Sequence, residues 1–282
     1  MRFKSISTFA GMMLFLSLFA SASAAGRLNT DPQQVTFVNA QGINLKGWLF
    51  KPEGQGPYPA VVLMPGCMGA YAPGDAQEID STYLEWSERL VDAGYVALLV
   101  DSFTPRNALK NQCGNGTTGI SEVSDRPRDA YAGLSYLASQ AFVAADRIGL
   151  VGWSHGGSAV MAAMDESQFK NGARFKAAVA FYPGCVLSNA FGGVQKSSWK
   201  PYAPFVILQG SADTVADPIT CTNRVAIAGQ LGAASVTINI FENAQHRFDG
   251  AGNVANAFTQ HDVDAKIAAD TQALRFFDRH LP

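Results

Sequence analysis

Apolar runs and amphipathic segments alternate along most of the chain. Short runs that are apolar almost throughout predict strands buried on both faces of a sheet. They occupy residues 60–64, 95–100, 147–151, 177–182, 205–209 and 236–241. Segments with apolar positions three and four residues apart predict helices over residues 82–93, 125–139, 154–164, 223–231 and along the C-terminal stretch. This alternation predicts an α/β fold, with a mostly parallel central sheet and helices on both faces.

The two ends of this series carry more specific signals. Residues 34–38 and 43–50 predict an opening antiparallel pair of strands. Thr82 and Glu85 have the spacing of a capping box at a helix start, and Gly94 is placed to end that helix. The buried stripe expected for the closing helix consists of Ile267, Leu274, Phe277 and Leu281.

Composition favours one folded domain and excludes some classes of partner. Of the 282 residues 48% are apolar and 16% are charged, which is too apolar for a disordered chain. The formal net charge is −2, without the basic excess typical of nucleic-acid binding, so no nucleic-acid partner is expected. No linker or composition break interrupts residues 25–282, which we therefore expect to form a single domain.

Residues 1–24 have the layout of a secretory signal peptide. Arg2 and Lys4 precede an apolar stretch over residues 9–19, and small residues follow, so cleavage is expected after Ala22 or Ala24. The apolar stretch is shorter than the roughly 20 residues that a membrane-spanning helix needs. We therefore expect a secreted or periplasmic protein without stable membrane insertion after signal cleavage; an uncleaved anchor is the alternative.

Export changes the interpretation of the four cysteines, Cys67, Cys113, Cys185 and Cys221. They form no Cys-x-x-Cys pair and no Cys/His cluster of zinc type, so no metal site is expected. Cysteines in an oxidising compartment pair as disulfides. Pairing Cys67 with Cys113 and Cys185 with Cys221 joins loops at the same end of successive strands. We favour it over the other two connectivities and over four free thiols.

The most informative segment is Gly152-Trp153-Ser154-His155-Gly156-Gly157. This Gly-x-Ser-x-Gly motif lies directly after one expected strand and directly before an expected helix, which is the context of a nucleophile elbow. A serine hydroxyl is a weak nucleophile and must be projected from a tight turn toward a base. The flanking glycines remove side chains that would collide there. Ser154 is therefore the candidate nucleophile, and a helix-capping serine is the alternative.

The base that a serine nucleophile needs is a histidine, and the chain has four. His155 adjoins Ser154 on the same turn, so its side chain is expected to point elsewhere. His261 and His280 lie in the polar flanks of the last helix. His246 remains, in the loop after the last strand, and is the candidate base.

An acid that orients the histidine is expected in the loop after an intervening strand. Residues 205–209 lead into Gly210-Ser211-Ala212-Asp213, which makes Asp213 the candidate. Asp217 is the rival, but it lies farther from the strand end. Asp249 is assigned to a local turn because it follows His246 by only three residues.

The negative charge of a tetrahedral intermediate needs fixed hydrogen-bond donors. One candidate is the backbone N–H of His155, directly after the nucleophile at a helix start. The other is the backbone N–H of Cys67, in the loop after residues 60–64. A disulfide between Cys67 and Cys113 would stiffen this loop, so its reduction is expected to lower turnover before the protein unfolds.

Two further patterns are assigned neither a cofactor nor a metal. Gly114-Asn115-Gly116-Thr117-Thr118-Gly119 matches a dinucleotide-binding pattern but opens no evident helix, so it is interpreted as a loop. His261, Asp262 and Asp264 lie at a helix start, where the helix dipole favours acidic residues. We interpret them as a solvated first turn.

With these residues in place, the chain resembles the dienelactone hydrolase family of α/β-hydrolases over roughly residues 42–281. The resemblance rests on the Ser154 motif and on short segments before and after it. They are Met64-Pro65-Gly66-Cys67-Met68-Gly69, Val100-Asp101-Ser102-Phe103, Asp146-Arg147-Ile148-Gly149, Phe181-Tyr182-Pro183-Gly184-Cys185 and Gly210-Ser211-Ala212-Asp213.

The resemblance implies hydrolysis of carboxylic esters or lactones by a triad of Ser154, Asp213 and His246, with an acyl-enzyme intermediate and no metal or organic cofactor. The founding dienelactone hydrolases use a cysteine nucleophile, whereas this chain has Ser154, so the dienelactone substrate is not carried over. Exported relatives with serine resemble general esterases, or hydrolases of amide-linked polymers such as poly(aspartic acid).

The expected partner is thus a small ester or lactone, or a polymeric substrate. Residues 186–199, Trp153 and Phe248 are expected to border the acyl pocket. For an amidase or peptidase acting on a polyanion, a basic patch would have to come from Lys196, Lys200 or Arg247. The alternative outside enzymes is a non-catalytic binding protein that keeps an α/β-hydrolase shell.

Overall fold

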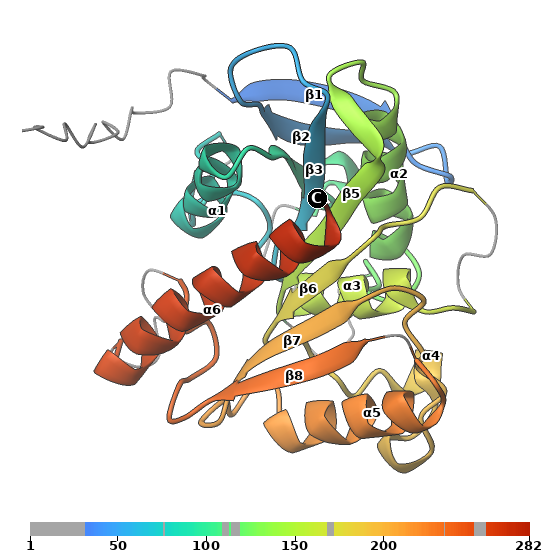
Figure 1. The fold of residues 1–282 in the computed structure, drawn as a ribbon, viewed down its shortest axis with the longest axis vertical. Coiled ribbons are helices and arrows are strands. Elements are labelled where there is room, and N and C mark those ends of the chain that lie inside the picture. The colour runs from blue at the N-terminus through green and yellow to red at the C-terminus, as the bar shows by residue number, and fades with distance from the viewer. Residues whose placement is uncertain are drawn as a thin grey trace, which may run out of the picture.

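One eight-stranded sheet organises the molecule (Figure 1). The computed structural model describes residues 32–75, 77–108, 113, 119–167, 172–233, 235–250 and 258–282; the expected signal peptide lies outside them. The strand order is β1-β2-β4-β3-β5-β6-β7-β8. The strands are β1 (Gln33–Val38), β2 (Asn44–Phe50), β3 (Tyr58–Met64), β4 (Val96–Asp101), β5 (Val143–Trp153), β6 (Ala178–Phe181), β7 (Phe205–Gly210) and β8 (Val236–Phe241).

The pairing confirms a mostly parallel sheet with an antiparallel beginning. β1 pairs with β2, and β2 with β4, in antiparallel fashion. From β4 through β3, β5, β6 and β7 to β8 every neighbouring pair is parallel. The carboxyl ends of these six strands therefore lie along one edge of the sheet, where loops from distant parts of the sequence meet.

Helices cover both faces of the sheet, as the sequence predicts. Buried side chains of α1 and α6 belong to the core on one face, and those of α2, α3 and α5 to the core on the other (Figure 1). No helix in the described ranges has the length and hydropathy needed to span a bilayer. The helices are α1 (Ser81–Asp92), α2 (Arg126–Ala138), α3 (His155–Met164), α4 (Ser188–Phe191), α5 (Pro218–Gln230) and α6 (Gln260–His280), with short 3₁₀ turns η1 (Thr104–Arg106) and η2 (Val194–Lys196).

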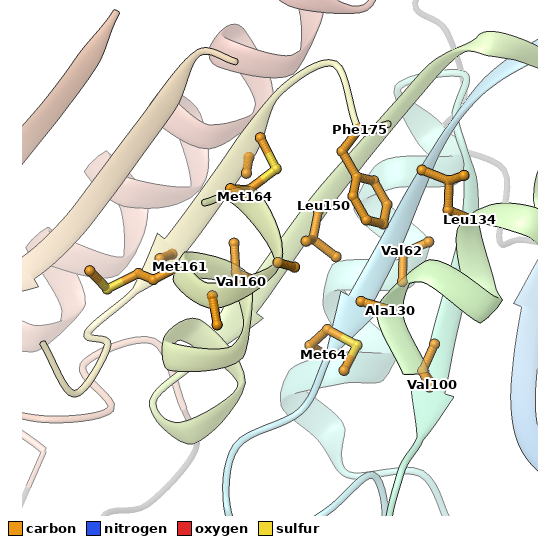
Figure 2. Close-up of a cluster of buried hydrophobic side chains, with 14 of the residues drawn as sticks. Val62, Met64, Val100, Ala130, Leu134, Leu150, Val160, Met161, Met164 and Phe175 are labelled. Atoms are coloured by element: carbon orange, nitrogen blue, oxygen red, sulfur yellow. The ribbon is translucent and has the colours of Figure 1, made fainter. Parts of the chain in front are cut away.

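Figure 2 shows the core between the sheet and helices α2 and α3. Side chains from the middle strands meet apolar side chains of both helices, and all of them are almost inaccessible to solvent. The labelled residues of strands and helices are Val62, Met64, Val100, Leu150, Ala130, Leu134, Val160, Met161 and Met164. This packing fixes α3, which begins directly after Ser154, against the sheet.

Helix α1 begins differently from the expectation. Its N-cap is Asp80, whose side chain accepts a hydrogen bond from the backbone N–H of Thr82 at 2.9 Å. The capping box expected from Thr82 and Glu85 is therefore wrong, because the aspartate two residues earlier takes the capping role. The stop at Gly94 is confirmed by its backbone φ of +88°, which favours glycine.

The buried face of α6 also differs from the expected stripe. Ile267 is 63% exposed, whereas Phe277 and Leu281 are buried and Leu274 is partly buried. Alanines fill the rest of the contact, and their small side chains let the helix approach the sheet. A Cβ atom on Gly149 of β5 would lie 2.8 Å from the Phe277 ring. The buried apolar positions within the helix are Ala265, Ala269, Ala273 and Phe277.

Candidate active site

The candidate site is assembled at the carboxyl ends of five parallel strands. β3 leads into Pro65, β5 into Ser154, β6 into Tyr182, β7 toward Asp213, and β8 toward His246. Each of these residues thus lies within a few positions of the end of a strand, and pairing in the sheet fixes the position of that end. All five strands correspond to apolar runs predicted from the sequence, and the loops after four of them, all but the loop of Tyr182, were expected to contribute to the site.

Ser154 lies on a strained turn between β5 and α3. Its backbone has φ 51° and ψ −115°, a conformation rare for a residue with a side chain. Gly152 and Gly156 allow this turn because they lack side chains, for which neither position has space. A Cβ atom on Gly156 would lie 2.0 Å from the carbonyl oxygen of Met64, and one on Gly152 would lie 2.5 Å from the carbonyl oxygen of Gly156.

The structure brings Ser154, His246 and Asp213 into one hydrogen-bonded series. Nε2 of His246 lies 3.0 Å from Oγ of Ser154, and Nδ1 of His246 lies 2.7 Å from Oδ2 of Asp213. The His246 side chain is 11% exposed and the Asp213 side chain is fully buried. Because a carboxylate only accepts hydrogen bonds, Nδ1 of His246 carries the proton, and Nε2 is left to accept one from Ser154.

The carboxylate of Asp213 is fixed by its own loop. Its Oδ1 accepts hydrogen bonds from the backbone N–H groups of Val215 and Ala216, both at 2.8 Å. Its Oδ2 accepts a further one from Nε2 of Gln209 at 2.7 Å. The rival, Asp217, lies on the exposed N-cap of α5 and accepts from the backbone N–H of Ile219 at 3.0 Å.

A buried arginine orders the loop that carries Cys67. Arg126 donates one hydrogen bond to the carbonyl oxygen of Pro65 at 2.6 Å and another to Nδ1 of His155 at 2.9 Å. The backbone N–H of Gly66 donates to the hydroxyl of Tyr83 at 2.8 Å and is therefore occupied. The amide of Cys67 comes next along the loop. The amide of His155 lies in the first turn of α3, where N–H groups have no intrahelical acceptor.

The side chain of His155 points away from Ser154, as expected, but it also lines the cavity. Its Nε2 lies 3.1 Å from Oε2 of Glu122. Burial lowers the pKa of His155, so the ring is neutral at pH 7 and its Nδ1 accepts from Arg126. The hydrogen bond to His155 lowers the pKa of Glu122, and burial lowers the pKa of Arg126 to about 10.

Both disulfides favoured from the sequence are present. Cys67 is bonded to Cys113, with Cα atoms 4.9 Å apart, and Cys185 is bonded to Cys221, with Cα atoms 5.1 Å apart. The first ties down the loop with the candidate amide of Cys67. The second joins the loop after β6 to α5.

A cavity of about 350 Å³ opens onto Ser154 and His246. Trp153 lines it as expected, but Phe248 does not, because its ring is fully buried in the core, where it packs against Phe181 and Phe241. None of residues 186–199 lines the cavity either; Gly184 is the last lining residue after β6. Further lining side chains are Met68, Asp80, Tyr83, Glu122, Tyr182, Val215 and Arg247.

Asp249 lies in the local turn that the sequence predicted, but its side chain also makes a long-range contact that the sequence did not predict. It is 1% exposed, and its Oδ2 accepts a hydrogen bond from Nε1 of Trp153 at 2.7 Å. Burial raises its pKa to about 6. Sequence reasoning missed it because nothing near Asp249 in the sequence indicates a donor 96 residues away. Arg126 was missed for the same reason, since a helix-start arginine is usually exposed.

The two patterns set aside from the sequence differ in outcome. Residues 114–118 of the glycine-rich pattern lie outside the described residues. Asp262 is buried rather than solvated: it forms a capping box with Thr259 and accepts from the backbone N–H of Gln245 at 2.8 Å. It thereby holds the loop next to His246 against the start of α6.

Curated relatives match parts of this chain. Dipeptidyl peptidase 8 from Mus musculus is 28% identical over 172 residues, which are 55% of this chain and 17% of the relative. The "Probable 2-oxo-3-(5-oxofuran-2-ylidene)propanoate lactonase" from Bradyrhizobium sp is 31% identical over 130 residues, 43% of this chain and 46% of the relative. The chain thus spans less than half of either relative.

Solved structures share the fold over almost the whole chain. An esterase from Pyrococcus furiosus aligns with a TM-score of 0.62 and 15% identity, over 90% of this chain and 95% of that chain. A dienelactone hydrolase-like promiscuous phosphotriesterase from metagenomic libraries aligns with a TM-score of 0.65 and 19% identity, over 89% and 99%. At these identities the likeness establishes the α/β-hydrolase fold alone.

The family itself is established by sequence. The model of the dienelactone hydrolase family matches residues 45–281, which include every strand from β3 onward and all helices. The same residues contain the Ser154 turn, the loops of Asp213 and His246, and the cavity between them. This chain belongs to the dienelactone hydrolase family, within the α/β-hydrolase superfamily.

Proposed function

We propose that this protein is an exported serine hydrolase that cleaves carboxylic ester or lactone bonds through an acyl-enzyme intermediate. One observation carries the proposal: the hydrogen-bonded series from Ser154 through His246 to Asp213 ends at a cavity of the size of small-molecule sites. Membership of a hydrolase family supports it.

In the proposed reaction Ser154 Oγ attacks the acyl carbonyl carbon while Nε2 of His246 takes its proton. Asp213 holds the proton on Nδ1 and stabilises the imidazolium that forms. The carbonyl oxygen becomes an oxyanion, which the backbone amides of Cys67 and His155 stabilise. His246 then protonates the leaving alkoxide. A water, deprotonated by His246, then attacks the acyl carbon, and His246 returns this proton to Oγ of Ser154 as the bond to the acyl group breaks and the carboxylic acid leaves.

The cavity supports a small, partly apolar substrate. Met68, Tyr83, Trp153, Tyr182 and Val215 supply apolar surface around Ser154. The relative from Bradyrhizobium is named a lactonase, and the esterase from Pyrococcus furiosus shares the fold. A small ester or a lactone is therefore the substrate class that we propose, rather than a long polymer.

An amidase or peptidase acting on a polymer is the second candidate, because dipeptidyl peptidase 8 matches 55% of this chain. The basic patch that a polyanionic substrate would need is not gathered at the cavity. Arg247 lines it, whereas Lys200 forms an ion pair with Glu166 elsewhere, and Asp80 and Glu122 add negative charge to the lining. These charges disfavour a polyanion such as poly(aspartic acid).

Export is proposed on two observations. The N-terminal sequence has the layout of a signal peptide, and two disulfides join loops of the folded part. Disulfides persist in secreted and periplasmic proteins and are rare in the cytosol.

Release of nitrophenol from nitrophenyl acetate, butyrate and octanoate tests the proposal, with the oxidised mature protein beside Ser154→Ala and Ser135→Ala. Ser135 lies on the exposed face of α2, so its substitution controls for the loss of a hydroxyl. We expect Ser154→Ala to lose activity and fluorophosphonate labelling, and Ser135→Ala to keep both. A parent protein that neither hydrolyses these esters nor reacts with the probe would favour the binding-protein alternative.

A further inference from the structure

Asp249 places a carboxylate in the core beside the candidate site without making contact with the cavity. It is 1% exposed. Its Oδ2 accepts a hydrogen bond from Nε1 of Trp153 at 2.7 Å, and its Oδ1 accepts one from the hydroxyl of Tyr182. Burying a charge costs free energy unless the charge is paired or hydrogen-bonded, so we asked what these two hydrogen bonds do for the site.

Both donors adjoin reacting groups. Trp153 is the residue before Ser154, so its ring position bears directly on the strained turn that carries the nucleophile. The Tyr182 ring meets the His246 ring edge to face, with centroids 4.8 Å apart. One carboxylate thus binds a neighbour of the nucleophile and a neighbour of the base.

Asp249 itself lies on the loop of the base, three residues after His246. It therefore joins three segments: the end of β5, the end of β6 and the loop after β8. The rings that it binds are already packed together, since Trp153 stacks on Phe181 at 5.5 Å and Phe181 packs against Tyr182 at 6.3 Å. Packing sets the position of these rings, and the carboxylate fixes how their polar atoms face the loop.

We propose that Asp249 is a positioning residue that, through Trp153 and Tyr182, holds Ser154 and His246 at reactive distance. The proposal rests on the function proposed above. Only the carboxylate can accept from both donors. An asparagine in its place can accept from one donor and presents an N–H to the other. At neutral pH the carboxylate is the form present, since burial raises the pKa of Asp249 only to about 6.

Asp249→Asn, with Asp165→Asn as its matched control, tests this role. Asp165 is also a buried carboxylate, 2% exposed, but it accepts a hydrogen bond from the backbone N–H of Lys200 at 2.8 Å and does not line the cavity. The measurements are kcat and KM for nitrophenyl acetate per folded molecule, with the melting temperature. We expect Asp249→Asn to lower kcat about 10- to 100-fold with KM within about threefold. Asp165→Asn should keep kcat within about twofold while it loses stability.

A purely structural role predicts the opposite pattern. If Asp249→Asn lowers the melting temperature but keeps kcat per folded molecule within about twofold, the proposal is overturned. Should Asp249→Asn fail to fold, Tyr182→Phe decides instead: it removes one donor and retains the carboxylate and the ring. We then expect kcat to fall at least about threefold, and an unchanged kcat would overturn the proposal. Failure of the proposed function is distinguishable, because the parent protein would then show no turnover at all.

Discussion

At the scale of single residues, two of the groups proposed for catalysis, Asp213 and Ser154, are held in place by residues close to them in the sequence. The carboxylate of Asp213 accepts hydrogen bonds from two backbone N–H groups and from a glutamine side chain, in addition to its contact with His246. The turn that carries Ser154 requires glycine at positions 152 and 156, because a Cβ atom at either position would collide with the backbone. Because these supports are local, small changes of one side chain are expected to have separable effects.

Asp213 and Asp217 offer a matched pair for testing the acid. Asp213→Asn leaves the loop geometry nearly unchanged but stops enforcing the tautomer of His246, so kcat is expected to fall about 10⁴-fold. Asp217→Asn changes an exposed cap of α5 and should alter kcat by less than about twofold. Steady-state kinetics with nitrophenyl acetate measures both. Equal losses in the two variants would contradict the assignment of the acid.

At the scale of elements, the two disulfides close loops of similar length but differ in what they hold. The Cys67–Cys113 bond spans 46 residues and the Cys185–Cys221 bond spans 36, so removing either is expected to cost roughly 2–5 kcal/mol of stability. Only the first bond anchors the loop of the proposed oxyanion amide.

Replacing the cysteines of each bond with alanine separates stability from turnover. Cys67→Ala with Cys113→Ala should lower kcat at least about tenfold, because a loosened amide stabilises the oxyanion less well. Cys185→Ala with Cys221→Ala should keep kcat within about twofold at a comparable loss of stability. Kinetics and urea unfolding of both double variants provide the test, and an equal fall of kcat in the two would count against the role of the Cys67 loop.

Helix α6 provides a second comparison between elements. Phe277 is fully buried against Gly149 of β5, whereas Ile267 is 63% exposed on the same helix. Phe277→Ala is expected to lower the free energy of unfolding by about 3–5 kcal/mol. Ile267→Ala should change it by less than about 0.5 kcal/mol. Denaturant titration of the two variants measures the difference, and similar values would contradict the observed face of α6.

At the scale of the whole molecule, Asp249 makes stability depend on pH in an unusual direction. Burial raises its pKa from 3.8 to about 6, so the folded protein binds a proton at Asp249 more tightly than the unfolded chain does. Its contribution to stability therefore grows as pH falls through 6 and is complete below 3.8. Charged and titratable groups that act on it are Tyr182, Asp270, Lys266, Arg247 and Tyr83.

The difference in unfolding free energy between the parent and Asp249→Asn isolates this effect. From pH of about 7 to about 4 the parent should gain up to roughly 3 kcal/mol relative to the variant, since asparagine does not titrate. Carboxyls whose pKa is lowered, such as Glu85 and Glu122, act in the opposite direction in both proteins and cancel. Urea unfolding at several pH values measures the difference; a difference that stays flat would show that Asp249 is not buried as described.

The sequence predicted the sheet, the turn at Ser154, the loops of Asp213 and His246, and the cysteine pairing, because each depends on local pattern and strand order. Burial of polar side chains was not predictable in the same way. Asp249 and Arg126 bind atoms 96 and 61 residues away, and only the completed fold brings those atoms near. The same limit explains Phe248, whose apolar ring belongs to the core rather than to the cavity.

The long sequence separations within the site bear on how the molecule regains activity after unfolding. Ser154 and His246 are 92 residues apart, His246 and Asp213 are 33 apart, and Arg126 reaches back 61 residues to Pro65. Contacts that close such long loops form after local helices and turns. Recovery of turnover during refolding will therefore lag behind recovery of helical signal. A chain whose helices have formed but whose sheet is incomplete is expected to show no turnover, because Ser154, His246 and Asp213 are not yet in contact.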